Sequence, residues 1–89
     1  MQEELTKIVR KMVVEIAEVD ETALQDSQRF AEVGLDSLQA VELLVSIERR
    51  FGCEIPQDEL RHFTDVASVV QTVYPFVQPS LARTAEAAS

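Results

Sequence analysis

The chain has 89 residues, of which 46% are hydrophobic, and its 16 acidic and 8 basic side chains give a net charge of −8. A chain of this length forms one domain with one modest core, and its negative charge argues against nucleic-acid binding because phosphate backbones would be repelled. No apolar run reaches the ~18 residues that span a membrane, and the first residues are charged where a signal peptide is apolar. We therefore expect a cytoplasmic protein, and a monomeric one.

Helical periodicity marks the first part of the chain. Apolar residues recur at helical spacing between Glu4 and about Glu18, which predicts an amphipathic helix. The segment from Val19 to Asp36 has no such period and is strongly acidic, with Arg29 as its single base. We expect it to be a long loop packed against the helices, since four apolar residues can anchor it: Leu24, Phe30, Val33 and Leu35.

Capping signals delimit a second helix. Asp36 is a preferred N-cap residue, and Gln39 three positions later completes a capping box. The helix should run to about Arg50 or Phe51 and stop at Gly52. Projection at ~100° per residue predicts its core face, with Val41 at the border: Ala40, Leu44, Ile47 and Phe51.

Two further helices are predicted in the C-terminal half. Pro56 suits the first turn of a short helix that ends near Phe63. Thr64 or Asp65 then caps a fourth helix, which should end at Pro75. Its core stripe is formed by Val66, Val69, Val70 and Val73.

These segments together predict an all-α fold: a small four-helix bundle of three longer helices and one short one, with a long first loop. We assign residues 1–76 to this domain. Residues 77–89 are mostly small and polar, and we expect them to form a flexible C-terminal tail.

Ser37 is the residue that the sequence places best for a chemical modification. Asp36 already fills the role of N-cap, so the hydroxyl of Ser37 in the first turn is left to face solvent. A phosphate esterified to this hydroxyl would lie near unbonded N–H groups and the positive end of the helix dipole. The sequence therefore favours a phosphoryl-type modification here, although a serine near a helix start is also common for purely structural reasons.

The second helix also carries apolar residues away from its core face. Leu38 and Val45 lie two turns apart on another face, beside Glu42. The pair fits a docking strip for a partner protein or ordinary packing at the edge of the core, and the pattern does not separate the two.

At this point the residues resemble the attachment motif of acyl carrier proteins. The resemblance rests on Asp36, Ser37 and Leu38, preceded by Val33 and Gly34, and on the order of the surrounding segments. A long first helix, an acidic loop, a second helix closed by Phe51 and Gly52, a short third helix and a valine-rich fourth all follow the pattern of that family. The match runs from about Leu5 to Tyr74, nearly the whole domain, and is typical of the freestanding type II carriers.

The resemblance implies a cofactor, a modified residue and partners. Ser37 would carry 4′-phosphopantetheine, whose thiol holds an acyl group as a thioester, and Asp36 would assist recognition by the Mg²⁺-using phosphopantetheinyl transferase. Other partners would be acyl-loading, condensing or acyl-transfer enzymes of fatty-acid, polyketide or related biosynthesis, with basic docking patches. The docking positions implied on this chain are Glu32, Leu38, Glu42, Val45 and Glu48.

The chain also departs from carriers of primary fatty-acid synthesis. Gln39 replaces an acid that often follows the triplet there, and Arg49 and Arg50 stand where such carriers often continue with acids. Gly34 and Leu35 argue against the peptidyl carriers, which commonly have two glycines before the motif. A peptidyl or aminoacyl carrier, and a helical adaptor without prosthetic group, remain the alternatives.

No residues suggest catalysis or metal binding. The sequence assembles no nucleophile with a base and oxyanion donors, and the acids of the loop lack the spacing of a calcium site. We expect His62, the only histidine, to form a helix-surface pair with Asp58 or a contact with a partner, and not to act as a catalytic base. We expect Cys53, the only cysteine, to be a half-buried, unreactive thiol. The protein alone should not be an enzyme.

Overall fold

The computed structural model describes residues 2–88, and side chains are described for residues 2–80. This part of the chain contains α1 (Gln2–Ala17), α2 (Ser37–Phe51) and α3 (Val66–Ala88), together with three short 3-10 helices, η1 (Glu21–Ala23), η2 (Phe30–Val33) and η3 (Gln57–His62). The predicted all-α bundle of three long helices and one short helix is confirmed, and the short helix is η3.

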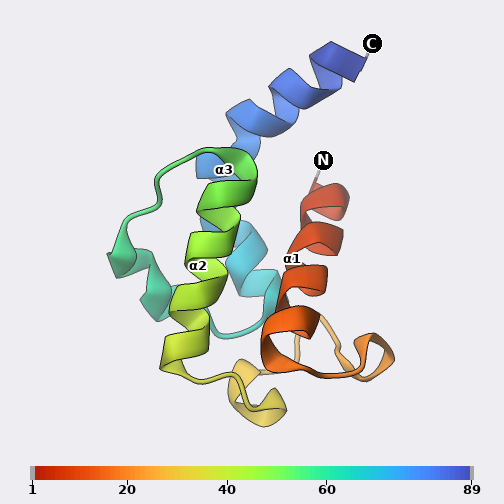
Figure 1. Ribbon diagram of the computed structural model, residues 1–89, viewed down its shortest axis with the longest axis vertical. Coiled ribbons are helices and arrows are strands. Elements are labelled where there is room, and N and C mark those ends of the chain that lie inside the picture. The colour runs from red at the N-terminus through yellow and green to blue at the C-terminus, as the bar shows by residue number, and fades with distance from the viewer. Residues whose placement is uncertain (1, 89) are drawn as a thin grey trace.

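The three long helices pack around one core. α3 lies against α1, α2 and η3, and the segment between α1 and α2 passes beneath the ends of both helices (Figure 1). The predicted valine stripe of α3 is confirmed, since all four valines are buried. Leu43 in α2, which the helical projection left out, is fully buried as well, and so is Val13 in α1.

The long loop is tied to the bundle by both apolar and polar contacts. Leu24, Phe30 and Leu35 are buried in the common core. The backbone N–H of Phe30 donates to the carbonyl of Thr64 over 2.8 Å, and Arg10 forms an ion pair of 2.7 Å with Asp26. The expectation of a loop packed against the helices is therefore confirmed, and η1 and η2 within it were not predicted.

The predicted end of the fourth helix at Pro75 is wrong, because α3 continues to Ala88 through Pro75 and Pro79. Proline removes one N–H from the helix ladder and usually breaks it. Here both prolines lie on the exposed side, whereas Val77 is fully buried and the hydroxyl of Ser80 donates to the carbonyl of Phe51. Packing against α2 thus holds the helix together where local propensity would end it.

These contacts also bear on the boundary drawn after residue 76. Val77 contributes to the core, so the packed part of the domain extends beyond that boundary. That the remaining C-terminal residues are flexible in solution stays a prediction.

No helix among the described residues is long and apolar enough to cross a membrane.

Candidate functional site

The start of α2 is built by the predicted capping box. The carboxylate of Asp36 accepts a hydrogen bond from the backbone N–H of Gln39 over 2.8 Å, and the side-chain oxygen of Gln39 accepts one from the N–H of Asp36 over 3.2 Å. At the other end, Gly52 adopts a left-handed conformation with φ of 62° and closes the helix. Both predicted ends of this helix are confirmed.

Gln39 makes one further contact that the sequence did not reveal. Its side-chain N–H₂ group donates to the carbonyl of Ile16 near the end of α1, over 3.2 Å. A carboxylate at this position could complete the capping box but could not donate to a carbonyl. The amide that departs from the pattern of fatty-acid carriers therefore ties the start of α2 to α1.

Ser37 is the first residue of α2 and its side chain is exposed. Because Asp36 already caps the helix, the Ser37 hydroxyl makes no hydrogen bond to any described residue. The first N–H groups of a helix lack intrahelical partners and, together with the helix dipole, favour an anion. An exposed hydroxyl next to such donors fits a phosphodiester linkage, so the residues present are compatible with a phosphopantetheine group.

The loop before α2 determines how Ser37 is presented. Gly34 follows η2 with φ of 82°, a left-handed conformation that glycine adopts without steric cost. This turn lets Leu35 insert into the core, where its N–H donates to the carbonyl of Phe30 over 2.9 Å. Because Leu35 is buried, the chain reaches the surface at the next two residues, Asp36 and Ser37, which are both exposed.

A groove of about 780 Å³ opens beside Ser37. It lies between the η2 region, the start of α2 and η3, and its apolar lining is formed by Phe30, Leu35, Ala40, Val41, Leu60 and Phe63. Ser27, Arg29 and Arg61 are among the polar residues that line it. The groove offers space next to the candidate attachment point without opening the packed centre of the bundle.

The implied docking residues do not all have the same surroundings. Leu38 is 69% exposed and Val45 is 37% exposed, and Glu32 and Glu42 are exposed too. Glu48 differs, because its carboxylate is half-buried and accepts a hydrogen bond from the N–H of Ile55 over 2.9 Å. Glu48 therefore helps to hold the segment after α2, and its docking role stays a prediction.

Other described side chains, away from the start of α2, bear on metal binding and on the surroundings of His62. Among the described side chains, no group of three or more histidine, cysteine or acidic residues is arranged to hold a metal ion. The expected pairing of His62 with Asp58 does not occur, since His62 instead accepts a hydrogen bond from Arg61 over 3.3 Å.

Cys53 is half-buried, and burial raises the pKa of its thiol, with the negative charge of Glu48 as a second cause. Because only the thiolate reacts, we expect native protein to react with iodoacetamide several-fold more slowly at pH 8 than the urea-unfolded chain. Glu48→Gln keeps an acceptor for Ile55 but removes the charge, so it should lower the pKa of Cys53 and speed the reaction. Intact mass over time measures the rates, and equal rates for native and unfolded protein would contradict this picture.

Comparison with known proteins agrees with the arrangement at the start of α2. Residues 7–73 match the family model described as "Phosphopantetheine attachment site", so the chain belongs to that family of non-catalytic carrier domains, which bear covalently bound 4′-phosphopantetheine. A segment of the non-reducing polyketide synthase pigA of Monascus ruber is 33% identical over 72 residues, or 81% of this chain. The chain spans only 3% of the length of that relative.

The family defines what the protein does at a coarse level. Residues 7–73 form a carrier domain for phosphopantetheine-bound acyl intermediates. Domains of this family carry the group and do not themselves catalyse a reaction. Because the relative holds its matching segment within a far longer chain, the freestanding form stays a prediction.

Proposed function

We propose that the chain is an acyl carrier of polyketide biosynthesis that holds its intermediates on a phosphopantetheine arm at Ser37. The observation that carries this proposal is the exposed hydroxyl of Ser37 at a helix start whose capping position is filled by Asp36. The likeness to a polyketide synthase segment supports the pathway. The side-chain amide of Gln39 also supports this pathway, because it stands where fatty-acid carriers often have an acid and it forms a hydrogen bond to α1 that an acid could not form.

The arm supplies a terminal thiol on which acyl groups are held as thioesters. In loading, the Ser37 oxygen forms a bond to the phosphorus of coenzyme A that bears pantetheine; the pyrophosphate bond breaks, and adenosine 3′,5′-bisphosphate leaves with the serine proton. The protein provides the exposed oxygen, the unbonded N–H groups of the first turn and Asp36 beside it. The groove next to Ser37 provides an apolar surface that the arm or its cargo can contact.

Mass spectrometry of the intact protein tests this function. Incubation with coenzyme A, Mg²⁺ and a broad-specificity phosphopantetheinyl transferase should add one phosphopantetheine to the chain. Subsequent incubation with malonyl-CoA and a malonyl transferase of polyketide biosynthesis should add one malonyl group, which hydroxylamine should remove because it cleaves thioesters. A chain that gains no phosphopantetheine would instead be a helical adaptor.

A further inference from the structure

The side chain of Gln39 connects the ends of two helices. Its oxygen accepts a hydrogen bond from the backbone N–H of Asp36, the N-cap of α2, over 3.2 Å. Its N–H₂ group donates to the carbonyl of Ile16, in the last turn of α1, over 3.2 Å. Among the described residues, this second bond is the only hydrogen bond between α1 and α2. We call this pair of bonds the Gln39 bridge.

The end of α1 depends on contacts from outside the helix. Glu18, which follows α1, has φ of 55°, in the left-handed region where glycine is the usual residue at a helix end. The N–H of Val19 donates back to the carbonyl of Val14 over 3.3 Å and closes this turn. The carbonyl of Ile16 is among the last four of the helix, which have no intrahelical partner. A conformation that a residue does not favour persists where neighbouring contacts hold it, and the bridge supplies such a contact.

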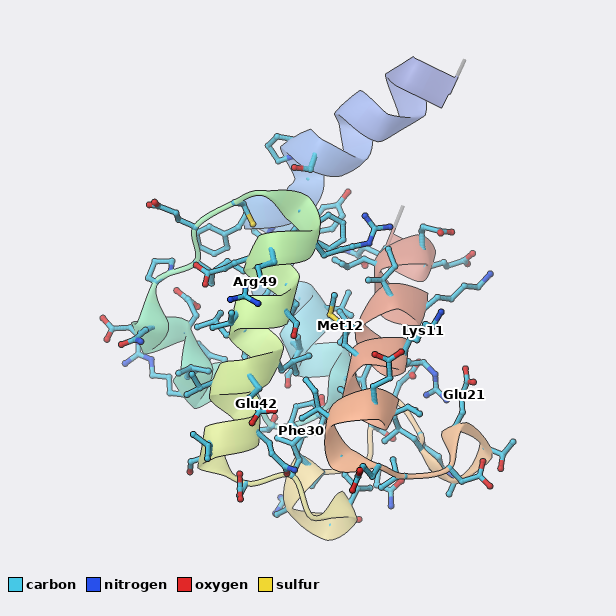
Figure 2. The ribbon with its side chains drawn as sticks, viewed as in Figure 1. Lys11, Met12, Glu21, Phe30, Glu42 and Arg49 are labelled. Carbon is cyan, nitrogen blue, oxygen red and sulfur yellow. The ribbon has the colours of Figure 1, made fainter. Side chains whose placement is uncertain are left out.

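The segment that leads into α2 is held by a different part of the bundle. Phe30 and Leu35 are buried, and the N–H of Phe30 donates to the carbonyl of Thr64, just before α3. Figure 2 shows Phe30 near the end of the bundle where α1 ends and α2 begins. Ser37 is exposed and makes no hydrogen bond to a described residue, so its direction is determined by the turn that contains it. The loop thus ties this turn to the α3 side, and the bridge ties it to α1.

We infer that Gln39 is a positioning residue for the loading of Ser37: its amide fixes the first turn of α2 against the end of α1, so that the hydroxyl is presented to the transferase in one orientation. The inference rests on the proposed function, because loading at Ser37 is the step that it concerns. Gln39 acts through the turn and not on the reacting atoms. Without the bridge the turn would sample orientations that the transferase cannot use, and only the competent fraction would bind.

Gln39→Glu separates the bridge from the local effects of this residue. A carboxylate still accepts from the N–H of Asp36, so the capping box is kept, but it cannot donate to the carbonyl of Ile16. An acid in the first turn also interacts favourably with the helix dipole and attracts a basic partner. These local effects would tighten the start of α2 and improve loading. Loss of the bridge acts in the opposite direction, so the sign of the change decides between them.

Amide hydrogen exchange of the isolated protein tests the bridge without any enzyme. The N–H of Ala40 forms the first backbone bond of α2, to the carbonyl of Asp36 over 2.9 Å, and the N–H of Val19 reports on the end of α1. After correction for intrinsic rates, both amides should exchange about three- to tenfold faster in Gln39→Glu, because one hydrogen bond is lost. Cys53 at the other end of α2 is the reference and should keep its rate, since that end can open while the bridge stays intact. The inference is wrong if Ala40 and Val19 are not both accelerated, or if Cys53 is accelerated equally.

Loading kinetics test the consequence for Ser37. With transferase, coenzyme A and Mg²⁺, Gln39→Glu should raise KM for the carrier by about three- to fivefold, since only the competent fraction binds, and leave kcat within about twofold. Gln71→Glu is the matched control, because it makes the same chemical change at an exposed residue of α3. Its KM should change by less than about twofold. A KM for Gln39→Glu that equals or lies below that of Gln71→Glu overturns the inference.

Gln39→Ala repeats the experiment without an added charge. This substitution removes the bridge together with the acceptor for the N–H of Asp36, so KM should rise at least as much as in Gln39→Glu. An unchanged KM in Gln39→Ala would show that the effect of Gln39→Glu comes from its charge, and it would overturn the inference.

Loading of the unaltered chain keeps the two proposals distinguishable. If the unaltered chain gains no phosphopantetheine, the proposed function fails, whereas hydrogen exchange still tests whether the bridge couples the two helix ends. If the unaltered chain is loaded and both Gln39 variants are loaded with the same KM, the proposed function stands and the positioning role of Gln39 is wrong.

Discussion

Ser37→Ala is expected to abolish the addition of phosphopantetheine, because the transferred group then has no oxygen to which it can be esterified. The side chain of Ser37 is exposed and makes no hydrogen bond to a described residue, so its removal should leave the fold intact. Incubation with coenzyme A and the transferase, followed by intact mass measurement, gives the result directly. The expected mass of the variant is that of the unmodified chain at all times.

Ser27→Ala provides the matched control for this experiment. Ser27 is also exposed and lines the same groove, but it lies in the loop before η2 and not at the start of a helix. This variant should load as fully as the unaltered chain. If Ser37→Ala still gains the group, or if Ser27→Ala loses it, the attachment residue has been assigned wrongly.

Leu43→Ala is expected to cause a large loss of stability. Leu43 is fully buried, and Leu→Ala in a core costs about 2–5 kcal/mol in free energy of unfolding. A domain of this size has roughly 5–13 kcal/mol in total, so much of its stability would be lost. Tm should fall by about 10–30 °C, which thermal unfolding followed by circular dichroism would measure.

Leu38→Ala is the control for Leu43→Ala, since it makes the same chemical change in the same helix. Leu38 is 69% exposed, and the free energy of unfolding should change by less than about 0.5 kcal/mol. A large loss of stability in this variant would show that Leu38 packs in the domain, and it would remove Leu38 from the docking surface.

Local sequence signals were sufficient for the fold class and for the candidate attachment point. The capping box of Asp36 and Gln39 and the stop at Gly52 each depend on groups within one helical turn of each other. They can therefore be predicted from the local sequence. The valine stripe of α3 follows from helical spacing in the same way. The solvent-facing position of Ser37 followed from the same local reasoning, because Asp36 leaves no capping role for it.

Contacts between distant segments decided the rest. Nothing near Pro75 indicates that α3 continues, because the stabilising contacts come from Val77 in the core and from Ser80 bonded to α2. The bond from Gln39 to Ile16 and that from Ile55 to Glu48 likewise join groups that no local pattern relates. The burial of Leu43 depends on how α2 is rotated against its neighbours, which a single-helix projection does not contain. The sequence by itself thus determined where α2 begins and that Ser37 faces solvent. Tertiary packing decided how far α3 extends and that Glu48 of α2 is engaged inside the domain.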